Sequence, residues 1–285
     1  MNELILYCKS YNKDVQRAKI LLNSIDEFNK DRIPFYISVP TEDVQLFKNI
    51  LGNPIGNIET LGRYERYKLI TDEEIIGEKL VQDWKTQQII KSSFWKLGLS
   101  FNNLMIDSDS YFIKPFYIKD FIVDEENHIP YTVMHEQKDL FSWTSKNVDI
   151  LGFDPQKSFV ETRTPIMEIF DRKGKIFDGG PGPMIFCAKV WKSLEDEYLK
   201  PNGLTFQNLI ETMPSEFSWY LEWILSKKIR DEEIIPLWPI EPIFKFFHYK
   251  EEYLDFKQQG YTLGHWSKNY FGITMQSSSG LPLVY

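Results

Sequence analysis

The sequence predicts an α/β fold with a mixed central sheet flanked by helices, in a single domain. Strand-like and helix-like segments alternate from the start of the chain, and such alternation is typical of parallel strands joined by crossover helices. The chain has 285 residues, of which 42% are hydrophobic and 26% charged. That composition allows one large core and argues against disorder.

The first elements set the pattern. Residues 3–8 are a short apolar run that predicts a buried strand. Asp14 can cap a helix in which apolar residues recur at helical spacing from Val15 to Phe28. Residues 34–40, PFYISVP, predict a second strand that ends at a proline, and Thr41 can cap the next helix. This β-α-β-α opening predicts parallel strands.

The rest of the chain is less regular. Residues 52–83 predict one short strand within irregular structure, and residues 117–175 predict short strands and polar turns outside the main sheet. The clearer expectations are a helix at 84–97 closed by Gly98, a central strand at 104–106, a turn and strand within 176–191, a helix at 214–229 and an edge strand within 234–249.

Charge and targeting signals narrow the class of protein. The net charge is −8, and no run of lysine or arginine is present, so an extended nucleic-acid surface is not expected. The start of the chain lacks the features of a signal peptide, and no stretch approaches the ~20 apolar residues of a membrane span. Cys8 and Cys187 lie in apolar runs and are expected to be buried thiols. We therefore expect a cytoplasmic protein, with contact to the inner face of a membrane left open.

The most informative segment is Asp107-Ser108-Asp109, which follows the apolar run Leu104–Ile106. Side chains two apart on an extended strand point to the same side, and two carboxylates so placed repel each other unless a cation lies near them. Hard divalent cations prefer carboxylate oxygens, so Mg²⁺ or Mn²⁺ is the predicted ligand. The alternative is an ordinary turn at the end of a strand.

Two other groups of residues are candidates for a ligand site. Ligands of parallel sheets lie beyond the carboxyl ends of the strands, where Lys9, Ser10 and Tyr11 follow the first strand. Gln88 and Lys91 lie on one face of the helix at 84–97. The lysine either reaches a phosphate or a sugar hydroxyl of a ligand or is solvated.

This order of elements, with the segment MIDSDSYFIKPF after the helix that bears Gln88 and Lys91, resembles the GT-A glycosyltransferases. The resemblance is to glycogenin-like enzymes and to uncharacterised bacterial proteins classed with them. It implies a metal-dependent, hexosyltransferase-type enzyme that moves a sugar from a nucleotide-diphosphate donor, most commonly UDP-linked, to a saccharide or lipid-linked saccharide. It also implies a role in bacterial surface-polysaccharide assembly. Residues 1–110 would form the nucleotide-binding half of the domain and residues 111–285 the acceptor-binding half.

The resemblance also implies roles for individual residues. Asp107 would face the ribose or metal-bound water, and Asp109 would bind Mn²⁺ or Mg²⁺ directly. The segment FDGGPGPMIF resembles the glycine-containing loop beside the donor sugar, with Gly179 and Gly180 allowing close backbone approach and Asp178 accepting from sugar hydroxyls. A tight turn between strands is the alternative.

Three later residues complete the expected site. Glu216, at the start of a helix, would act as general base in an inverting enzyme, whereas helix capping is the alternative. A late histidine often adds a metal ligand in this superfamily, and His248 is preferred over His265. A structural role remains the alternative for both histidines.

Two rival functions stay open at this stage. A nucleotidyltransferase would also use carboxylates and Mg²⁺, but the segment YCKSYNKD lacks the glycine-rich phosphate loop expected of that class. A non-catalytic carbohydrate-binding protein would use Trp143, Trp219 and Trp266 as stacking platforms.

Overall fold

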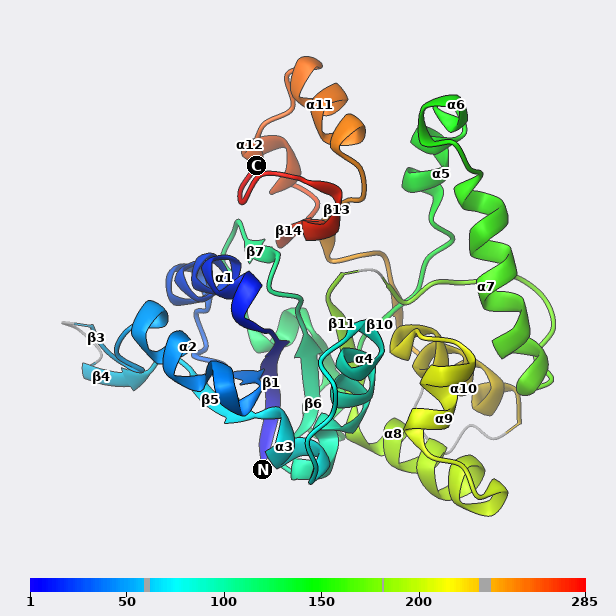
Figure 1. Ribbon diagram of the computed structural model, residues 1–285, viewed down its shortest axis with the longest axis horizontal. Helices are drawn as coiled ribbons and strands as arrows, with labels where there is room; N and C mark the ends of the chain where they lie inside the picture. Colours follow the sequence, from blue (N-terminus) through cyan, green and yellow to red (C-terminus); the bar gives the residue numbers. More distant parts are fainter. Residues whose placement is uncertain (59–61, 181, 231–236) are drawn as a thin grey trace.

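A five-stranded mixed sheet forms the centre of the molecule (Figure 1). This computed structural model describes residues 1–58, 62–180, 182–230 and 237–285. Four strands, β6, β1, β2 and β5, run parallel to one another, and β11 pairs antiparallel with β6. The predicted fold class is confirmed. In spatial order the strands are β11 (Met184–Cys187), β6 (Ser100–Met105), β1 (Asn2–Lys9), β2 (Phe35–Val39) and β5 (Lys68–Thr71).

Alternating side chains of β1 enter two separate cores. Leu4 and Leu6 pack on the face covered by α1 (Val15–Phe28) and α2 (Val44–Leu51). Ile5 and Tyr7 point to the opposite face, because successive side chains of a strand alternate. That face is covered by α4 (Trp84–Ser93), α8 (Ala188–Leu194), α9 (Phe206–Thr212) and α10 (Glu216–Arg230).

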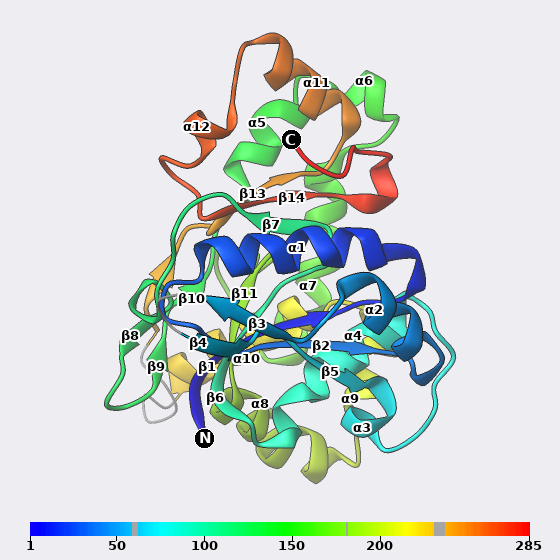
Figure 2. The ribbon, with the colours of Figure 1, turned by 90° about the vertical axis from the view of Figure 1, so that its left-hand side faces the viewer.

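Helix α1 lies between the central sheet and a smaller three-stranded sheet (Figure 2). The smaller sheet has the order β13 (Phe244–Phe247), β14 (Gly272–Met275) and β7 (Ser110–Phe112). Since β7 follows directly after Asp107–Asp109, the chain crosses from one sheet to the other at the aspartate pair. Helices α11 (Lys250–Gln258) and α12 (Leu263–Trp266) and an aromatic cluster cover the outer side of the smaller sheet.

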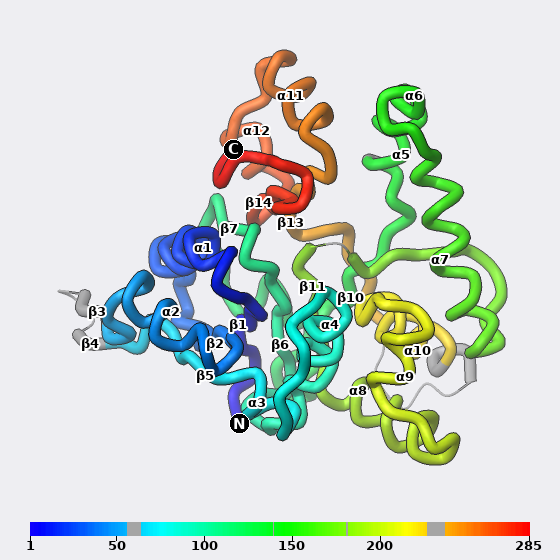
Figure 3. Tube along the Cα trace, viewed as in Figure 1, coloured from blue at the N-terminus to red at the C-terminus, as the bar shows by residue number. Residues whose placement is uncertain are grey.

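An arm of three helices leaves the body of the protein between β10 and β11 (Figures 1 and 3). It consists of α5 (Lys138–Thr144), α6 (Val148–Leu151) and α7 (Pro155–Ile169), and α7 packs against α10. The remaining elements are β3 (Ile55–Ile58), β4 (Gly62–Glu65), α3 (Asp72–Ile76), β8 (Ile122–Asp124), β9 (Ile129–Pro130), β10 (Thr132–Val133) and β12 (Pro239–Ile240).

The arm corrects the sequence-based expectation for residues 117–175. Short strands are present at β8, β9 and β10, but the second half of the segment is helical. Asp154 caps α7 through the N–H groups of Gln156 and Lys157, with Pro155 in the first turn. These start signals are clear, but Pro165 lies inside the helix, where proline is normally disfavoured, and the apolar residues are few, so the sequence pattern for a helix is weak.

Smaller expectations were wrong at two helix starts. Thr41 caps no helix, because it lies within a 3₁₀ turn and its hydroxyl donates to Glu73 at 2.8 Å. Asp14 stands before α1 but makes no side-chain capping bond. The helix expected at 84–97 is α4 followed by a 3₁₀ turn, and Gly98 ends it in the left-handed region, as predicted.

Other expectations are confirmed. Cys8 and Cys187 are buried free thiols. Pro239 and Pro242 both precede β13, which is an edge strand of the smaller sheet, whereas residues 234–236 lie outside the described ranges. Among the described helices, none has both the length and the apolar character needed for a membrane span.

Candidate functional site

A cleft of about 720 Å³ lies at the carboxyl ends of the parallel strands. Its described lining includes the end of β1, the turn after β6, the starts of α4 and α10, one face of α7 and the C-terminal segment around Ser277. Such an edge is where open parallel sheets place ligands. Most of the predicted site residues meet here, namely Lys9, Tyr11, Gln88, Lys91, Asp107, Asp109, Asp178, Gly180, Glu216 and His248.

The aspartate pair lies in a turn that joins the two sheets. Strand β6 ends at Met105, and the N–H of Ser110 donates to the carbonyl of Asp107 at 3.0 Å. The segment is a turn, which was the alternative interpretation, and both carboxylates line the cleft, so the metal site stays a prediction. The expectation of an extended strand at these positions was wrong, because Asp and Ser favour turns.

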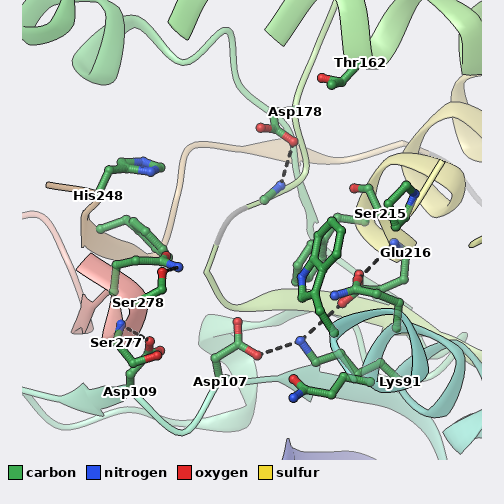
Figure 4. A pocket seen from close by; sticks show the side chains of 18 of the residues that line it. Lys91, Asp107, Asp109, Thr162, Asp178, Ser215, Glu216, His248, Ser277 and Ser278 are labelled. Carbon is green, nitrogen blue, oxygen red and sulfur yellow. Dashed lines mark hydrogen bonds and ion pairs between the residues drawn. The ribbon is translucent and has the colours of Figure 1, made fainter. Parts of the chain in front are cut away.

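The ammonium of Lys91 lies between two carboxylates (Figure 4). Its Nζ is 2.7 Å from Asp107 Oδ1 and 3.4 Å from Glu216 Oε1. Burial alone would lower the pKa of Lys91, but the two carboxylates raise it to above its usual range. Lys91 is therefore neither solvated nor free, and it remains a fixed cation at the wall of the cleft.

Glu216 faces Lys91 rather than the open cleft. Its side chain is 0% exposed, and burial is the main cause of its raised pKa. The amide of Gln88 lies against its carboxylate and its backbone N–H. Glu216 as general base stays a prediction, but this arrangement favours a role in holding Lys91.

The C-terminal segment fixes the second aspartate. Asp109 Oδ2 accepts the N–H of Ser277 at 2.8 Å, and its backbone carbonyl accepts the N–H of Met275 at 2.9 Å. Burial, followed by the charge of Asp107, raises the pKa of Asp109 to about 6. The site thus holds a carboxylate pair whose charge is only partly offset by Lys91.

Of the three residues at and just after the end of β1 that were predicted to bind a ligand, only some are free to do so. Lys9 Nζ is buried, 3.0 Å from Asp72 Oδ2 and 2.6 Å from the carbonyl of Ser10. Burial lowers the pKa of Lys9, and Asp72 opposes that effect. Ser10 is buried and is not among the lining residues, whereas Tyr11 lines the cleft.

Asp178 closes the base of the arm. The backbones of His135 and Asp178 exchange hydrogen bonds of 3.0 and 2.9 Å. The buried Asp178 carboxylate accepts from Arg163 at 3.1 Å, Gln137 at 2.7 Å and the N–H of Gly180 at 3.1 Å. Burial tends to raise its pKa, but these partners, Arg163 foremost, lower it below the usual range. Asp178 is therefore an ionised side chain that shapes the loop.

The glycines of that loop are required by space. A Cβ on Gly180 would lie 2.8 Å from the Phe217 ring, and one on Gly179 would lie 2.7 Å from the end of Met184. At Gly179 the flexible end of Met184 can move aside, whereas at Gly180 the added Cβ would meet the base of the Phe217 ring, so Gly180 is the more tightly constrained. The loop therefore packs closely on α10 and β11. As expected, the backbone at these glycines lies very close to other atoms, but these atoms belong to the protein itself. A close approach of this backbone to a donor sugar stays a prediction.

The two histidines lie in different places. His248 lines the cleft, and burial lowers the pKa of its ring to about 3, so the ring is neutral. His265 lies in α12, where its Nδ1 accepts the N–H of Thr262 at 3.2 Å, and it is not among the described lining residues of the cleft. Both remain predictions as metal ligands.

The donor set fits a divalent metal shared with a substrate. Among the described residues, no group of three or more His, Cys, Asp or Glu side chains is placed to hold a metal. Mg²⁺ commonly binds through one or two carboxylates, with water and substrate phosphates completing its shell. Asp107 and Asp109 supply such a pair, and burial together with the charge of Asp107 raises the pKa of Asp109.

Aromatic residues of the cleft differ from those that the sequence suggested. Trp143, Trp219 and Trp266 are buried, so their proposed role as stacking platforms is wrong. Their bulk fills the cores instead. Trp84 is 60% exposed and Phe153 47% exposed, and both line the cleft. Sequence analysis also missed Thr162, Arg163 and Ser277, because their positions depend on the arm and on the C-terminal segment.

Comparisons with known proteins place the chain in a family. Residues 3–174 match the model of DUF6492, a family of unknown function. The chain belongs to the DUF6492 family. A comparison with curated proteins found no match.

Among solved structures, this DUF6492 member is similar to mouse xyloside xylosyltransferase 1 in its apo form. The likeness covers 98% of this chain and 99% of that chain, with 9% identity and a TM-score of 0.49. Both values are low, so the residue roles proposed below rest on the geometry of this chain alone.

The buried carboxylate of Asp109 should cost stability when no metal is bound. Its folded pKa is raised, so ionisation destabilises the fold, and the effect is complete above a pH of about 6. We expect Asp109→Asn to stabilise the metal-free protein by about 1–3 kcal/mol at pH 8, with the gain fading as the pH falls toward 4. Urea denaturation with chelator measures this. Asp83→Asn is the control, since Asp83 caps α4 and its pKa is lowered, so no gain should follow. A destabilised Asp109→Asn protein would contradict the prediction.

Lys91 and Glu216 should be strongly coupled. Lys91→Ala leaves a fully buried carboxylate without its cation and should cost about 3–5 kcal/mol. Adding Glu216→Gln should recover part of that loss, which a double-mutant cycle in urea measures. The control is Lys96→Ala, whose pair with Glu195 is at the surface and should matter by less than about 1 kcal/mol. Additive effects of the two changes would show that the pair is not coupled.

Proposed function

We propose that this protein is a metal-dependent glycosyltransferase that uses a nucleotide-diphosphate sugar. The observation that supports this most is the pair Asp107 and Asp109, which lines a cleft at the carboxyl ends of parallel strands with the cation of Lys91 fixed beside it. Glycosyl transfer from such a donor needs a site for a diphosphate that leaves with negative charge. The GT-A resemblance of the sequence is consistent with the same activity.

The charge of the cleft supports a need for metal. Each described lysine or arginine that lines it is already paired, since Lys9 contacts Asp72, Lys91 contacts Asp107 and Glu216, and Arg163 contacts Asp178. A diphosphate would therefore meet an excess of negative charge unless a cation came with it. The described lining holds six carboxylates against these three cations, namely Asp14, Asp83, Asp107, Asp109, Asp178 and Glu216.

The chemistry divides between the metal and the chain. A divalent cation on Asp107 and Asp109 would supply positive charge to the diphosphate. Lys91, held by Glu216, would offset further charge on the leaving group from the wall of the cleft. An acceptor hydroxyl oxygen forms a bond to the anomeric carbon, the bond from that carbon to the diphosphate oxygen breaks with its electron pair on that oxygen, and the hydroxyl proton passes to a base or to solvent. UDP as donor nucleotide and surface polysaccharide as product remain part of the proposal.

Nucleotide binding is the direct test. A ligand at 100 times its dissociation constant stabilises the native state by roughly 2.7 kcal/mol. We expect one nucleoside diphosphate from a panel to raise the unfolding midpoint only when Mn²⁺ or Mg²⁺ is present. Asp107→Ala should abolish that rise and sugar transfer. Asp124→Ala is the matched control, because Asp124 is a surface carboxylate in a turn with Asn127. If no nucleoside diphosphate in the panel raised the unfolding midpoint of folded protein, the proposal would be wrong.

The role of Glu216 can be separated from that of a general base. Since Gln can still accept a hydrogen bond from Lys91, Glu216→Gln should keep kcat within about tenfold and leave the shape of the pH–rate profile unchanged. Removal of a general base would instead lower kcat by about 10²–10⁴-fold and remove the acidic limb of the profile. Circular dichroism of the variant excludes misfolding as the cause of either result.

A further inference from the structure

One face of α7 forms a wall of the cleft. Its lining residues are Pro155, Ser158, Phe159, Thr162 and Arg163, spaced three and four apart, so they share one helical face. Phe153, just before the helix, extends the wall with a ring that is 47% exposed. This face thus alternates aromatic rings with hydroxyl groups.

The start of α4 contributes another part of the cleft lining. Trp84 is its first residue and is 60% exposed, although it lines the cleft. Gln87 and Asp83 lie beside it in the lining and offer hydrogen-bonding groups. A large exposed ring next to polar groups suits a ligand that has both an apolar face and hydroxyls.

The charges of this region exclude an anionic ligand. Arg163 is the one cation that the described part of α7 contributes to the lining, and it is bound to Asp178 at 3.1 Å. Asp83 adds a negative charge next to Trp84. A ligand bearing carboxylate or phosphate would be repelled here, so the matching ligand is uncharged.

The wall formed by α7 lies away from the aspartate pair. Figure 4 shows Asp107, Asp109 and Lys91 on one side and Thr162 on the other, with Asp178 between them. A donor diphosphate at the aspartates would leave the region between α7 and Trp84 open to a second substrate. We infer that this region is the acceptor subsite, and that the acceptor is an uncharged saccharide stacked on Trp84 and Phe153. The inference rests on the proposed transferase function.

Binding without donor tests the subsite. The probe is an array of neutral oligosaccharides, with uronic-acid and phosphorylated saccharides beside them, applied to the full chain. A neutral saccharide that binds is then titrated against Trp84→Ala and Phe153→Ala. We expect at least a tenfold loss of affinity in both variants and an unchanged thermal shift by nucleotide and metal.

Matched controls separate stacking from general surface effects. Trp238→Ala and Ile150→Ala remove exposed apolar side chains that are not among the described lining residues, and both should bind like the unmodified protein.

The outcomes distinguish the inference from the function on which it rests. Binding of charged saccharides alone, or of none, with the nucleotide shift intact, would overturn the subsite and leave the transferase. If Trp84→Ala lost the thermal shift by nucleotide but kept saccharide binding, Trp84 would stack on the nucleotide base. That result would also overturn the acceptor subsite. If saccharide binding depended on Trp84 but no nucleotide shifted the unfolding midpoint, the saccharide subsite would be supported and the proposed transferase function would be rejected.

Discussion

The buried ion pair of Lys91 with Asp107 and Glu216 holds the candidate site together. It joins the last turn of α4, the turn after β6 and the first residue of α10, three segments that are distant in sequence. An unpaired charge in such a position would be costly, and each partner therefore depends on the others. Asp107 can stand in an acidic cleft because Lys91 is present, and Lys91 can be buried because Glu216 lies behind it.

The sequence predicted the framework well because the framework is encoded locally. The alternation of Leu4, Ile5 and Leu6 between two cores, and the glycine at position 98, each follow from the period or the backbone freedom of single residues. Asp107 and Asp109 were also recognisable, since carboxylates after a buried strand are unusual. The side chains that each of these residues contacts could not be predicted from local sequence. Lys91 appeared to be solvated or bound to phosphate, and only the packing of α4 against α10 shows that its ammonium is enclosed.

For the aromatic residues, the sequence suggested exposed binding surfaces where the structure has buried side chains. The abundance of tryptophan suggested stacking platforms, but Trp143, Trp219 and Trp266 fill cores, where large rings bury the most apolar surface. Trp84 is exposed and lines the cleft, but nothing in its local sequence distinguishes it from the buried tryptophans. Helix α7 was missed for a related reason: its inner face lines a cleft and mixes rings with hydroxyls, so it lacks the apolar stripe that identifies a helix packed on a core.

The backbone pairing of His135 with Asp178 has a consequence for the evolution of this fold. The pairing brings the two ends of the arm together, so that the chain leaves and re-enters the body at one point. A segment closed in this manner behaves as an exchangeable cassette: its length and its side chains can change while the strands, the aspartates and Lys91 keep their places. Relatives with the same aspartate turn could therefore line the cleft differently by replacing the arm alone, and an engineered graft between His135 and Asp178 is the direct way to change that lining.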